Sequence, residues 1–477
     1  MGQVVILGFG MQGNHPEAKG ILIKLALAFL AFGLVLFLPT PAGLTSQGKR
    51  VLAVVALAVV LWSATALPVA VSSLVVLIVL ASTRGVPSVS AAFVGFTSPV
   101  VFFLVGILAI GAAVVKTGLA DRAARFLLKK AQGSPGRLYI NLFLSLPPLA
   151  LVLPSAITRN AVLIPTYEQV FRTLGIGPED RLSRAVMLSL GILHPLVSSA
   201  FLTGGMAPMT TATLLGGFSW LRWFALMSVP YFSLLLLGGI LIYILNPPKG
   251  RDYQKGVELC PPSPGISPNE ARVFAVIGFT SLLWLTDFLH GLNPAIPALL
   301  AAALLLSPRI GVLGWEDFER SMSWSIFFVL GTSLSLAQAL GTSGAASWSA
   351  QELVRNLAAF SDRPWAVVVL IITIVGIVHL GITSFAACLS LLIPMVSAFA
   401  VSVGLNPLVC GLVVGIAVDA IVLYPAQTAT SILAYEGGYF QAKDVLQVGA
   451  GLFLLTILVV LFIALPYWRL LGLPLVP

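Results

Sequence analysis

The stretch FFLVG at residues 102–106 is repeated about half a chain later as FFVLG at residues 327–331. Outward from each copy, the same signals come in the same order. A Leu-Trp pair and then a proline lie upstream; a glycine turn, an amphipathic stretch and a polar break lie downstream. The first break has Ser155 with Pro165 ten residues on, and the second has Ser384 with Pro394 ten residues on. A hydrophobic chain with two matching halves and proline-bounded breaks is typical of a secondary transporter whose site lies between repeats.

The two amphipathic stretches differ in charge. Residues 119–137 carry five Lys or Arg against one Asp, whereas residues 343–364 carry two Arg balanced by one Glu and one Asp. Excess Lys and Arg in short flanking segments marks the cytoplasmic side. We therefore expect the first stretch on the inner surface and the second on the outer, which makes the second repeat inverted. The alternative is that both are merely solvated surface helices.

Composition restricts the class of protein. Of the 477 residues 58% are hydrophobic and only 9% are charged, whereas about a quarter of a soluble domain is charged. Apolar runs of about 20 residues, enough to cross a bilayer, recur along the chain, and we expect about 11 spans. The net charge of +9 comes from scattered residues, which favours positive-inside loops over a nucleic-acid partner. The three cysteines have no paired or metal-binding spacing.

A proline-rich linker at residues 247–268 divides the chain into comparable halves. The first inverted repeat, residues 1–246, should hold scaffold helices, a hairpin near 138–172 and a broken helix near 185–218. The second, residues 269–477, should hold scaffold helices, a hairpin near 365–400, a broken helix near 406–436 and a last helix near 446–470. We expect the apolar run at 21–38 to form the first transmembrane helix. It is too long for the apolar part of a signal peptide and lacks a clear cleavage site.

The breaks are of two kinds. Residues 151–160 and 381–386 are polar tips between apolar runs too short for two full spans, so each predicts a re-entrant hairpin. Residues 201–213 and 419–430 interrupt longer helices near a proline and resume with Thr-Ala-Thr. At such breaks helix N-termini favour anions, and freed carbonyls can hold a cation. We expect all four breaks to meet at one midplane site; singly, each could be a proline kink satisfied by its neighbours.

Three segments resemble motifs of the divalent anion:sodium symporter family, which belongs to the ion transporter superfamily. They are LWSATALP at residues 61–68, KTGLADR at 116–122 and FLTGGMAP at 201–208, and the resemblance extends over nearly the whole chain. The last segment is similar to a variant found in citrate carriers and plastid-type dicarboxylate translocators, and is closer to these than to the sodium/dicarboxylate members with Ser-Asn-Thr tips. The resemblance implies a scaffold part that dimerises and a transport part that moves like an elevator. It implies succinate, malate, 2-oxoglutarate, citrate or sulfate as substrate.

The chain departs from this family at the hairpin tips. Members often carry Ser-Asn-Thr there, whereas residues 155–157 are Ser-Ala-Ile and residues 384–386 are Ser-Phe-Ala. From the resemblance we expect substrate contacts from Ser155, Ala156, Thr158, Arg159, Thr203, Gly204, Ser384, Phe385, Pro425 and Thr428. If transport is coupled to sodium, we expect the cation near Ser155, Gly205, Thr383, Ser384 and Ala426.

Four ionisable residues, Arg159, Asp419, His194 and His379, lie in these apolar segments or next to them. For His194 hydrogen-bonded packing is favoured over a role as proton relay. A charged side chain inside a membrane must be paired or face water. Arg159 can present a bidentate fork to a carboxylate or sulfate; the alternative is an internal ion pair or a carbonyl-capping role. Asp419 could neutralise Arg159, bind a cation or carry a proton. His379 directly precedes the second tip and is a candidate proton partner, with hydrogen-bonded packing as the alternative.

The sequence lacks the motifs that are typical of other classes of function. The chain has no HExxH or GxSxG in a suitable setting for an enzyme, no repeated pore loop and no soluble sensing module. We therefore expect a sodium-coupled secondary transporter of a di- or tricarboxylate or a similar divalent anion, with no catalytic residues, no bound metal and no cofactor beyond Na+. The alternatives are a sodium-independent anion exchanger or a sulfate carrier and, more remotely, an intramembrane enzyme. We expect a homodimer in the plasma membrane with a cytoplasmic N-terminus.

Overall fold

The computed structural model describes residues 15–64, 67–119, 122, 135–152, 155–247, 265–356 and 363–477. Within these ranges every regular element is a helix. Nine helices there are long and apolar enough to cross a membrane, and three shorter apolar helices accompany them. The predicted fold class, an all-α polytopic membrane protein of two inverted repeats with hairpins and broken helices, is confirmed.

Two expectations fall largely outside the described residues. Of the basic stretch at 119–137, only residues 119, 122 and 135–137 are described, and residues 248–264 of the linker are not. The division of the chain at residues 247–268 and the sidedness of the two repeats therefore stay predictions.

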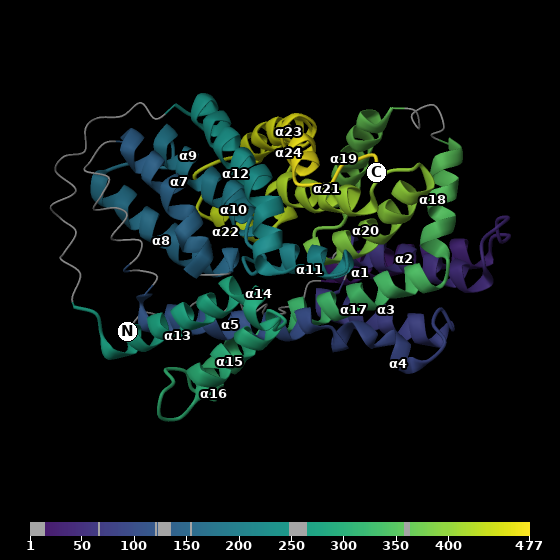
Figure 1. Ribbon diagram of the computed structural model, residues 1–477, viewed down its shortest axis with the longest axis horizontal. Helices are drawn as coiled ribbons and strands as arrows, with labels where there is room; N and C mark the ends of the chain where they lie inside the picture. Colours follow the sequence, from purple (N-terminus) through teal and green to yellow (C-terminus); the bar gives the residue numbers. More distant parts are fainter. Residues whose placement is uncertain are drawn as a thin grey trace.

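The first elements of each half pack into one layer, which we call the early layer; it forms the lower part of Figure 1. The first half supplies α1 (His15–Phe37), α2 (Ser46–Ala64), α3 (Val69–Ser82), α4 (Val89–Ala92), η1 (Val94–Thr97) and α5 (Pro99–Thr117). The second half supplies α13 (Pro268–Leu285), α14 (Asp287–His290), α15 (Ala295–Leu306), α16 (Trp315–Ser321) and α17 (Trp324–Thr342).

The remaining helices of each half form the late layer, the upper part of Figure 1, and α18 (Ala345–Asn356) runs between the two layers. The first half supplies the hairpin α7 (Pro135–Val152) and α8 (Ala156–Leu174), the broken helix α9 (Arg181–Leu188), η2 (Ser189–Leu193), α10 (His194–Ser199) and α11 (Met206–Leu214), and α12 (Trp220–Leu245). The second half supplies the hairpin α19 (Pro364–Gly381) and α20 (Phe385–Ser402), the broken helix α21 (Pro407–Ala420), η5 (Pro425–Gln427) and α22 (Ala429–Glu436), and α23 (Ala442–Val459), η6 (Val460–Ala464) and α24 (Leu465–Leu470).

The two halves interlock through equivalent pairs of helices. In the early layer α5 packs on α15, and its counterpart α17 packs on α3. In the late layer α8 packs on α22, and its counterpart α20 packs on α11. Each hairpin helix therefore contacts the second part of the other repeat's broken helix. Exchanging the two repeats leaves this set of contacts unchanged, as expected for two repeats related by a pseudo-two-fold axis.

The glycine that ends each copy of the repeated motif lies at one of these crossings. A Cβ atom on Gly106 would lie 2.5 Å from the carbonyl carbon of Ala298 in α15. A Cβ atom on Gly331 would lie 2.5 Å from the ring of Phe96 in η1. Small residues let helices approach closely where there is no water to drive them together. The repeated FFLVG and FFVLG sequences thus supply the contact surfaces that join the two repeats.

Two equivalent helices, α13 and α2, are each tied at the N-terminal end to the other repeat: α13 to the segment after α5, and α2 to the segment after α17. Arg122 forms a bidentate ion pair with Glu270, with Nε–Oε1 2.8 Å and Nη2–Oε2 2.9 Å. In the other pairing, Thr45 Oγ1 donates to the carbonyl of Ser343 at 2.8 Å. Glu270 also closes a capping box with Ser267, which fixes where α13 begins.

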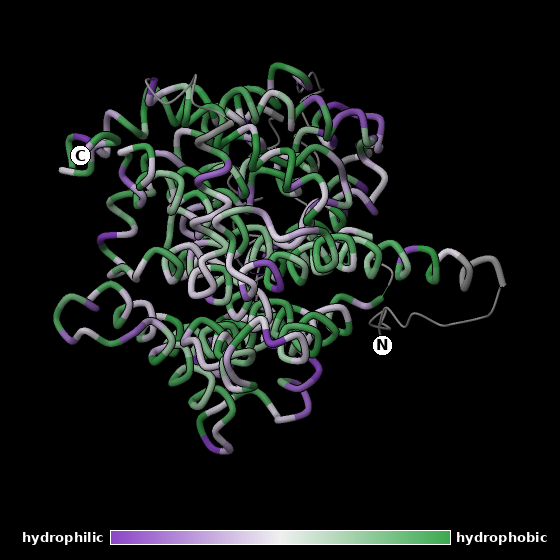
Figure 2. Tube along the Cα trace, turned by 90° about the vertical axis from the view of Figure 1, so that its right-hand side faces the viewer, coloured by the Kyte–Doolittle hydropathy of each residue, from purple (hydrophilic) through white to green (hydrophobic). Residues whose placement is uncertain are grey.

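Apolar side chains cover the outside of the molecule. Figure 2 shows the hydrophobic helix next to the N-terminus projecting from the body. This is α1, where only 6% of the span from Gly20 to Phe37 is buried. Leu22, Ile23 and Leu30 there are each more than half exposed. A helix that is apolar on all sides and left uncovered by protein fits a lipid environment.

Substituting Gly106 with alanine should weaken the joint between the repeats. The new methyl group would overlap the backbone of Ala298, and overpacking of this kind costs about 1–3 kcal/mol. The measurement is the thermal unfolding midpoint of the purified protein in detergent. Gly278→Ala is the matched control, because nothing lies within 4 Å of a Cβ atom at that helical position. Gly106→Ala should unfold at a lower temperature and Gly278→Ala should not; equal midpoints would contradict this account of the crossing.

Candidate functional site

The first hairpin tip is held by a serine at the start of a helix. Ser155 is the N-cap of α8, and its Oγ accepts a hydrogen bond from the amide of Thr158 at 3.2 Å. Ser155 and Ala156 are half-buried. The Thr158 side chain lies against the early layer, because its Oγ1 would be 3.1 Å from a Cβ atom on Gly111 in α5. Thr158 therefore lies where the two layers meet.

Arg159 is inside the protein. It is 1% exposed, its Nε donates to Nε2 of His194 at 2.6 Å, and its Nη2 donates to the hydroxyl of Ser198. Because His194 accepts at Nε2, its ring proton is on Nδ1, where it pairs with the Oδ1 of Asn160. The guanidinium thus links the first hairpin to the broken helix of the same repeat, and these two contacts are with uncharged groups.

A π-helical turn, η2, lies beside this network. A wider turn of this kind frees a backbone carbonyl from the regular helical pattern, and such turns are frequent at functional sites. Here Asn160 Nδ2 donates to the carbonyl of Leu190 at 2.7 Å. On the other side, Gly191 lets α22 approach, since a Cβ atom there would be 3.0 Å from Ala434. The turn is therefore held by the hairpin of its own repeat and by the half-helix of the other.

The break in the first repeat is stabilised by side chains of α12 and by a glycine. Trp220 Nε1 donates to Thr203 Oγ1 at 3.1 Å, so the Thr203 hydroxyl contacts α12. A Cβ atom on Gly204 would lie 1.8 Å from the carbonyl oxygen of Ser198, so only glycine fits. Gly205, half-buried, precedes the first turn of α11.

The second hairpin tip repeats the serine cap. Ser384 is the N-cap of α20 and accepts from the amide of Ala387 at 3.4 Å. Thr383, Ser384 and Phe385 are half-buried. His379 is fully buried near the end of α19; its Nδ1 pairs with the carbonyl of Ile382 at 2.8 Å, and its ring lies 5.5 Å from that of Phe385.

The break in the second repeat is held by the buried side chain of Gln427. Its Oε1 accepts from the amide of Leu423 at 2.7 Å, and its Nε2 donates to the carbonyls of Ile421 at 2.8 Å and His379 at 3.3 Å. Beyond it, Thr428 caps α22 by accepting from the amide of Ser431 at 3.2 Å. Pro425 is half-buried and Ala426 is exposed.

Asp419 lies at the end of α21 and is 3% exposed. Its Oδ2 accepts a hydrogen bond from the hydroxyl of Tyr231 in α12 at 2.7 Å. The contact joins the broken helix of the second repeat to the last helix of the first. This hydrogen bond gives the buried carboxylate a polar partner, which a buried charge requires.

The structure therefore arranges the predicted residues around two centres: Arg159, with the first tip and the first break, and Gln427, with the second tip and the second break. Asp419 connects the two, because its carboxylate interacts with Ser199 of α10 as well as with Tyr231 of α12. No role was predicted for Gln427 or Asn160, although each is a polar residue inside a segment identified as a break. Asn160 contacts Leu190 and His194 on another helix, and Gln427 contacts His379 of α19 besides two backbone groups of its own segment.

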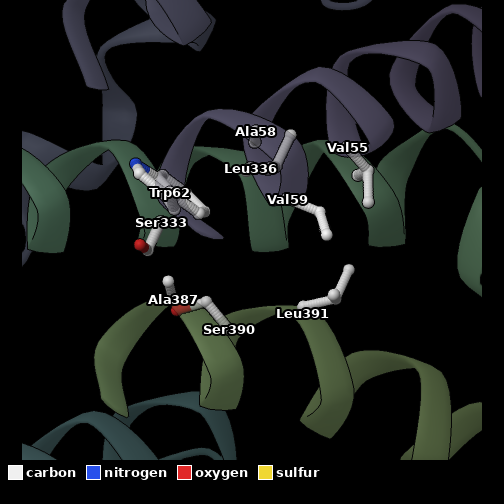
Figure 3. A pocket seen from close by; sticks show the side chains of 9 residues that line it. All are labelled: Val55, Ala58, Val59, Trp62, Ser333, Leu336, Ala387, Ser390 and Leu391. Atoms are coloured by element: carbon white, nitrogen blue, oxygen red, sulfur yellow. The ribbon is translucent and has the colours of Figure 1, made fainter. Parts of the chain in front are cut away.

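A small cavity lies where the second hairpin meets the early layer (Figure 3). Its volume is about 10 Å³, enough for one water molecule. Ser333 of α17 lies on one side and Ser390 of α20 on the other. Within the part of the chain that the structure describes, neither hydroxyl has a hydrogen-bond partner, and both are buried. The cavity thus marks a polar point on the boundary between the layers.

Comparison with known proteins agrees with this architecture. A family model described as the sodium:sulfate symporter transmembrane region matches residues 19–474. A membrane protein of Cupriavidus necator is 25% identical over 473 residues, covering 93% of this chain and 92% of that protein. The L-tartrate/succinate antiporter of Shigella sonnei is 30% identical over 398 residues, covering 78% of this chain and 80% of that protein.

Among solved structures, the YdaH transporter of Alcanivorax borkumensis resembles this chain with a TM-score of 0.52 at 15% identity, covering 97% of this chain and 100% of that one. That likeness concerns the fold. The family resemblance in the sequence is confirmed by the match over residues 19–474. The chain belongs to the sodium:sulfate symporter family of divalent anion transporters, and it is a membrane transporter of the carboxylate and sulfate type rather than an enzyme.

Proposed function

We propose that this protein exchanges dicarboxylates across the membrane without sodium, by an elevator movement of the late layer against the early layer. The observation that carries the proposal is the guanidinium of Arg159, buried at the first hairpin of the late layer. A cationic group in a membrane-embedded layer that also contains both pairs of breaks favours an anion as the transported species.

The N-terminal ends of four helices add to the positive electrostatic potential that Arg159 produces. Four helices of the late layer begin at the breaks: α8 after Ser155, α20 after Ser384, α11 after Gly205 and α22 after Thr428. The N-terminus of a helix carries roughly half a positive charge and presents free amides. In transporters with broken helices such ends face anionic groups of the substrate. An anion with two carboxylates can use one group at each hairpin.

The substrate class comes from the relatives. The Shigella sonnei protein, 30% identical over 398 residues, is an L-tartrate/succinate antiporter. Both of its named substrates are four-carbon dicarboxylates, so we place a C4-dicarboxylate first among the anions expected from the sequence. Tricarboxylates and sulfate are the next anions to test, because they differ from a C4-dicarboxylate in size and geometry.

Exchange is favoured over sodium symport by the tip residues. The Asn and Thr that family members often use at the tips are replaced by Ala156 and Ile157 in one hairpin and by Phe385 and Ala386 in the other. Arg159 instead supplies a fixed positive charge. In the proposed exchange cycle the dianion binds beside this charge, and the late layer moves only when it is loaded. Sodium symport is the second candidate, because the matching family model describes sodium:sulfate symporters.

In the mechanism we propose, the substrate binds between the tips and breaks of the late layer, with the capped serines and Arg159 orienting its carboxylates. The late layer then slides along α2, α5 and α17. Two points on this path have small side chains or a gap: Gly111 faces Thr158, and the water-sized cavity separates Ser333 from Ser390. Elsewhere α17 packs extensively on α20, so sliding has to break and remake that contact.

Counterflow in proteoliposomes tests exchange. Uptake of labelled succinate should require unlabelled succinate or L-tartrate inside the vesicles. The rate should be the same in sodium and in choline, because no sodium is bound in the transport step. Vesicles without protein give the background. Uptake into vesicles that hold no internal dicarboxylate, driven by an inward sodium gradient, would establish the symport candidate instead.

Arg159→Gln should remove counterflow, because glutamine keeps hydrogen-bonding capacity but not the charge that holds a dianion. We expect a loss of at least about 100-fold, in line with a buried charge-assisted contact worth about 3 kcal/mol. Arg159→Lys keeps the charge without the fork and should retain a small rate. Gel filtration and thermal unfolding show whether each variant is folded. A folded Arg159→Gln protein that exchanges succinate at the normal rate would rule out this role.

Cross-linking across the layer boundary tests the sliding movement. In the double variant Ser333→Cys/Ser390→Cys, a short bifunctional thiol reagent should join α17 to α20 across the cavity. If the layers slide, the cross-link stops counterflow by at least about tenfold, and a reducing agent restores it. Each single variant treated with the same reagent reports on the native cysteines. Full activity in a quantitatively cross-linked protein would exclude a sliding movement at this contact.

A further inference from the structure

The carboxamide of Gln427 lies between the C-terminal ends of two helices. α19 ends at Gly381 and α21 ends at Ala420. Gln427 Nε2 donates to one carbonyl near each end, that of His379 at 3.3 Å and that of Ile421 at 2.8 Å. The Oε1 atom accepts from the amide of Leu423 at 2.7 Å. The side chain is fully buried, and all of these contacts are with backbone groups of the hairpin and the break.

Such a meeting of helix ends is a place where a cation is stabilised. The C-terminus of a helix carries roughly half a negative charge, and transporters bind their coupling cations through carbonyls at unwound segments and half-helix C-termini. An amide NH2 group and a cation need the same lone pairs, so they compete for them. Here the carbonyls of His379 and Ile421 already accept hydrogen bonds from Gln427.

We propose that the Gln427 carboxamide takes the place of a coupling cation in the second repeat. This inference rests on the proposed exchange function and gives it a structural cause. A tethered amide satisfies the carbonyls in every state of the transport cycle, whereas a bound ion has to enter and leave with the substrate. The second repeat is therefore built to work without an ion.

Two of the residues expected to bind sodium in this repeat, Ser384 and Ala426, are weak candidates as side-chain ligands. Ser384 uses its Oγ to cap α20, and Ala426 is exposed and has no side-chain oxygen. The nearby carbonyls that a cation would use are those that accept from Gln427. The expectation of a cation near Thr383, Ser384 and Ala426 is thus at odds with the donor that lies beside them.

The first repeat has no carboxamide at the position equivalent to Gln427. Pairing Pro208 with Pro425 and the two Thr-Ala-Thr segments with each other places Thr210 where the second repeat has Gln427. Thr210 is fully buried, and its Oγ1 has no hydrogen-bond partner among the described residues. A threonine side chain is too short to bridge two helix ends. The carboxamide is therefore a property of this position and not of the repeated fold.

Thermal unfolding in sodium and in choline tests the inference without any transport assay. The wild-type protein, Gln427→Glu and Gln427→Thr are compared in detergent at equal ionic strength. In Gln427→Glu a carboxylate oxygen replaces Nε2 and faces two carbonyl oxygens, so the variant should unfold at a lower temperature in choline. Sodium should raise its unfolding midpoint in a saturable manner, because a ligand that binds only the folded state stabilises it.

Gln427→Thr, which gives the second repeat the residue of the first, leaves the two carbonyls open and should also gain a sodium-dependent rise. If Gln427→Glu does not fold, the sodium response of Gln427→Thr tests the inference in its place. Gln338→Glu is the matched control: it makes the same change of charge at an exposed position of α17 and should show no added response to sodium.

The outcomes separate this inference from the proposed function. A sodium response that appears or grows in the Gln427 variants supports the inference, even if the wild-type protein also responds and exchange without sodium is thereby refuted. Sodium responses that are the same in the wild-type protein and in both variants, or absent in all three, would overturn it. Succinate counterflow, measured separately on the wild-type protein, decides the proposed function.

Discussion

The structure depends on one constraint: backbone groups freed by a break inside a membrane have to find partners within the protein. Each break meets it with its own side chains. Ser155 and Ser384 cap the helices that begin at the hairpin tips. Asn160 takes the carbonyl released by the π-helical turn, and Gln427 bridges the unwound segment of the second repeat. The polar residues that interrupt the apolar runs are thus the ones that make the interruptions stable.

Close backbone contact is the second requirement, and glycine meets it. A Cβ atom on Gly449 of α23 would lie 1.9 Å from the carbonyl oxygen of Val422, in the unwound part of the second repeat. Gly204 has a similar contact with Ser198 in the first. Both breaks are therefore in close contact with backbone atoms, in addition to the side chains of Trp220 and Gln427 that hold them. Packing of this kind holds an irregular segment in one conformation.

The repeats and the hairpins could be predicted from the sequence, because they depend on local sequence patterns. The motif ending in Gly106, its copy ending in Gly331 and the spacing from each capped serine to a proline identify the repeats and hairpins without knowledge of any contact. The partners of Arg159 could not be predicted in this way. His194 and Ser198 lie 35 and 39 residues further along the chain, and only the packing of α8 on α10 brings them together. Gln427 was missed for the same reason, since its role depends on where α19 ends.

The two hairpins share a capped serine and differ just beyond it, and this difference gives the symmetric fold a direction. Four residues after Ser155 is Arg159, whereas four residues after Ser384 is Cys388, an apolar side chain in this setting. The contact with the early layer is also reversed. In the first repeat a glycine, Gly111, faces Thr158; in the second a larger residue, Leu336, shares the cavity wall with Ala387. The first hairpin therefore carries a cationic side chain one helical turn after its capped serine, and the second carries an apolar one. The two tips differ chemically although their backbones repeat, so any ligand that lies between them meets a charged surface on one side and a neutral surface on the other.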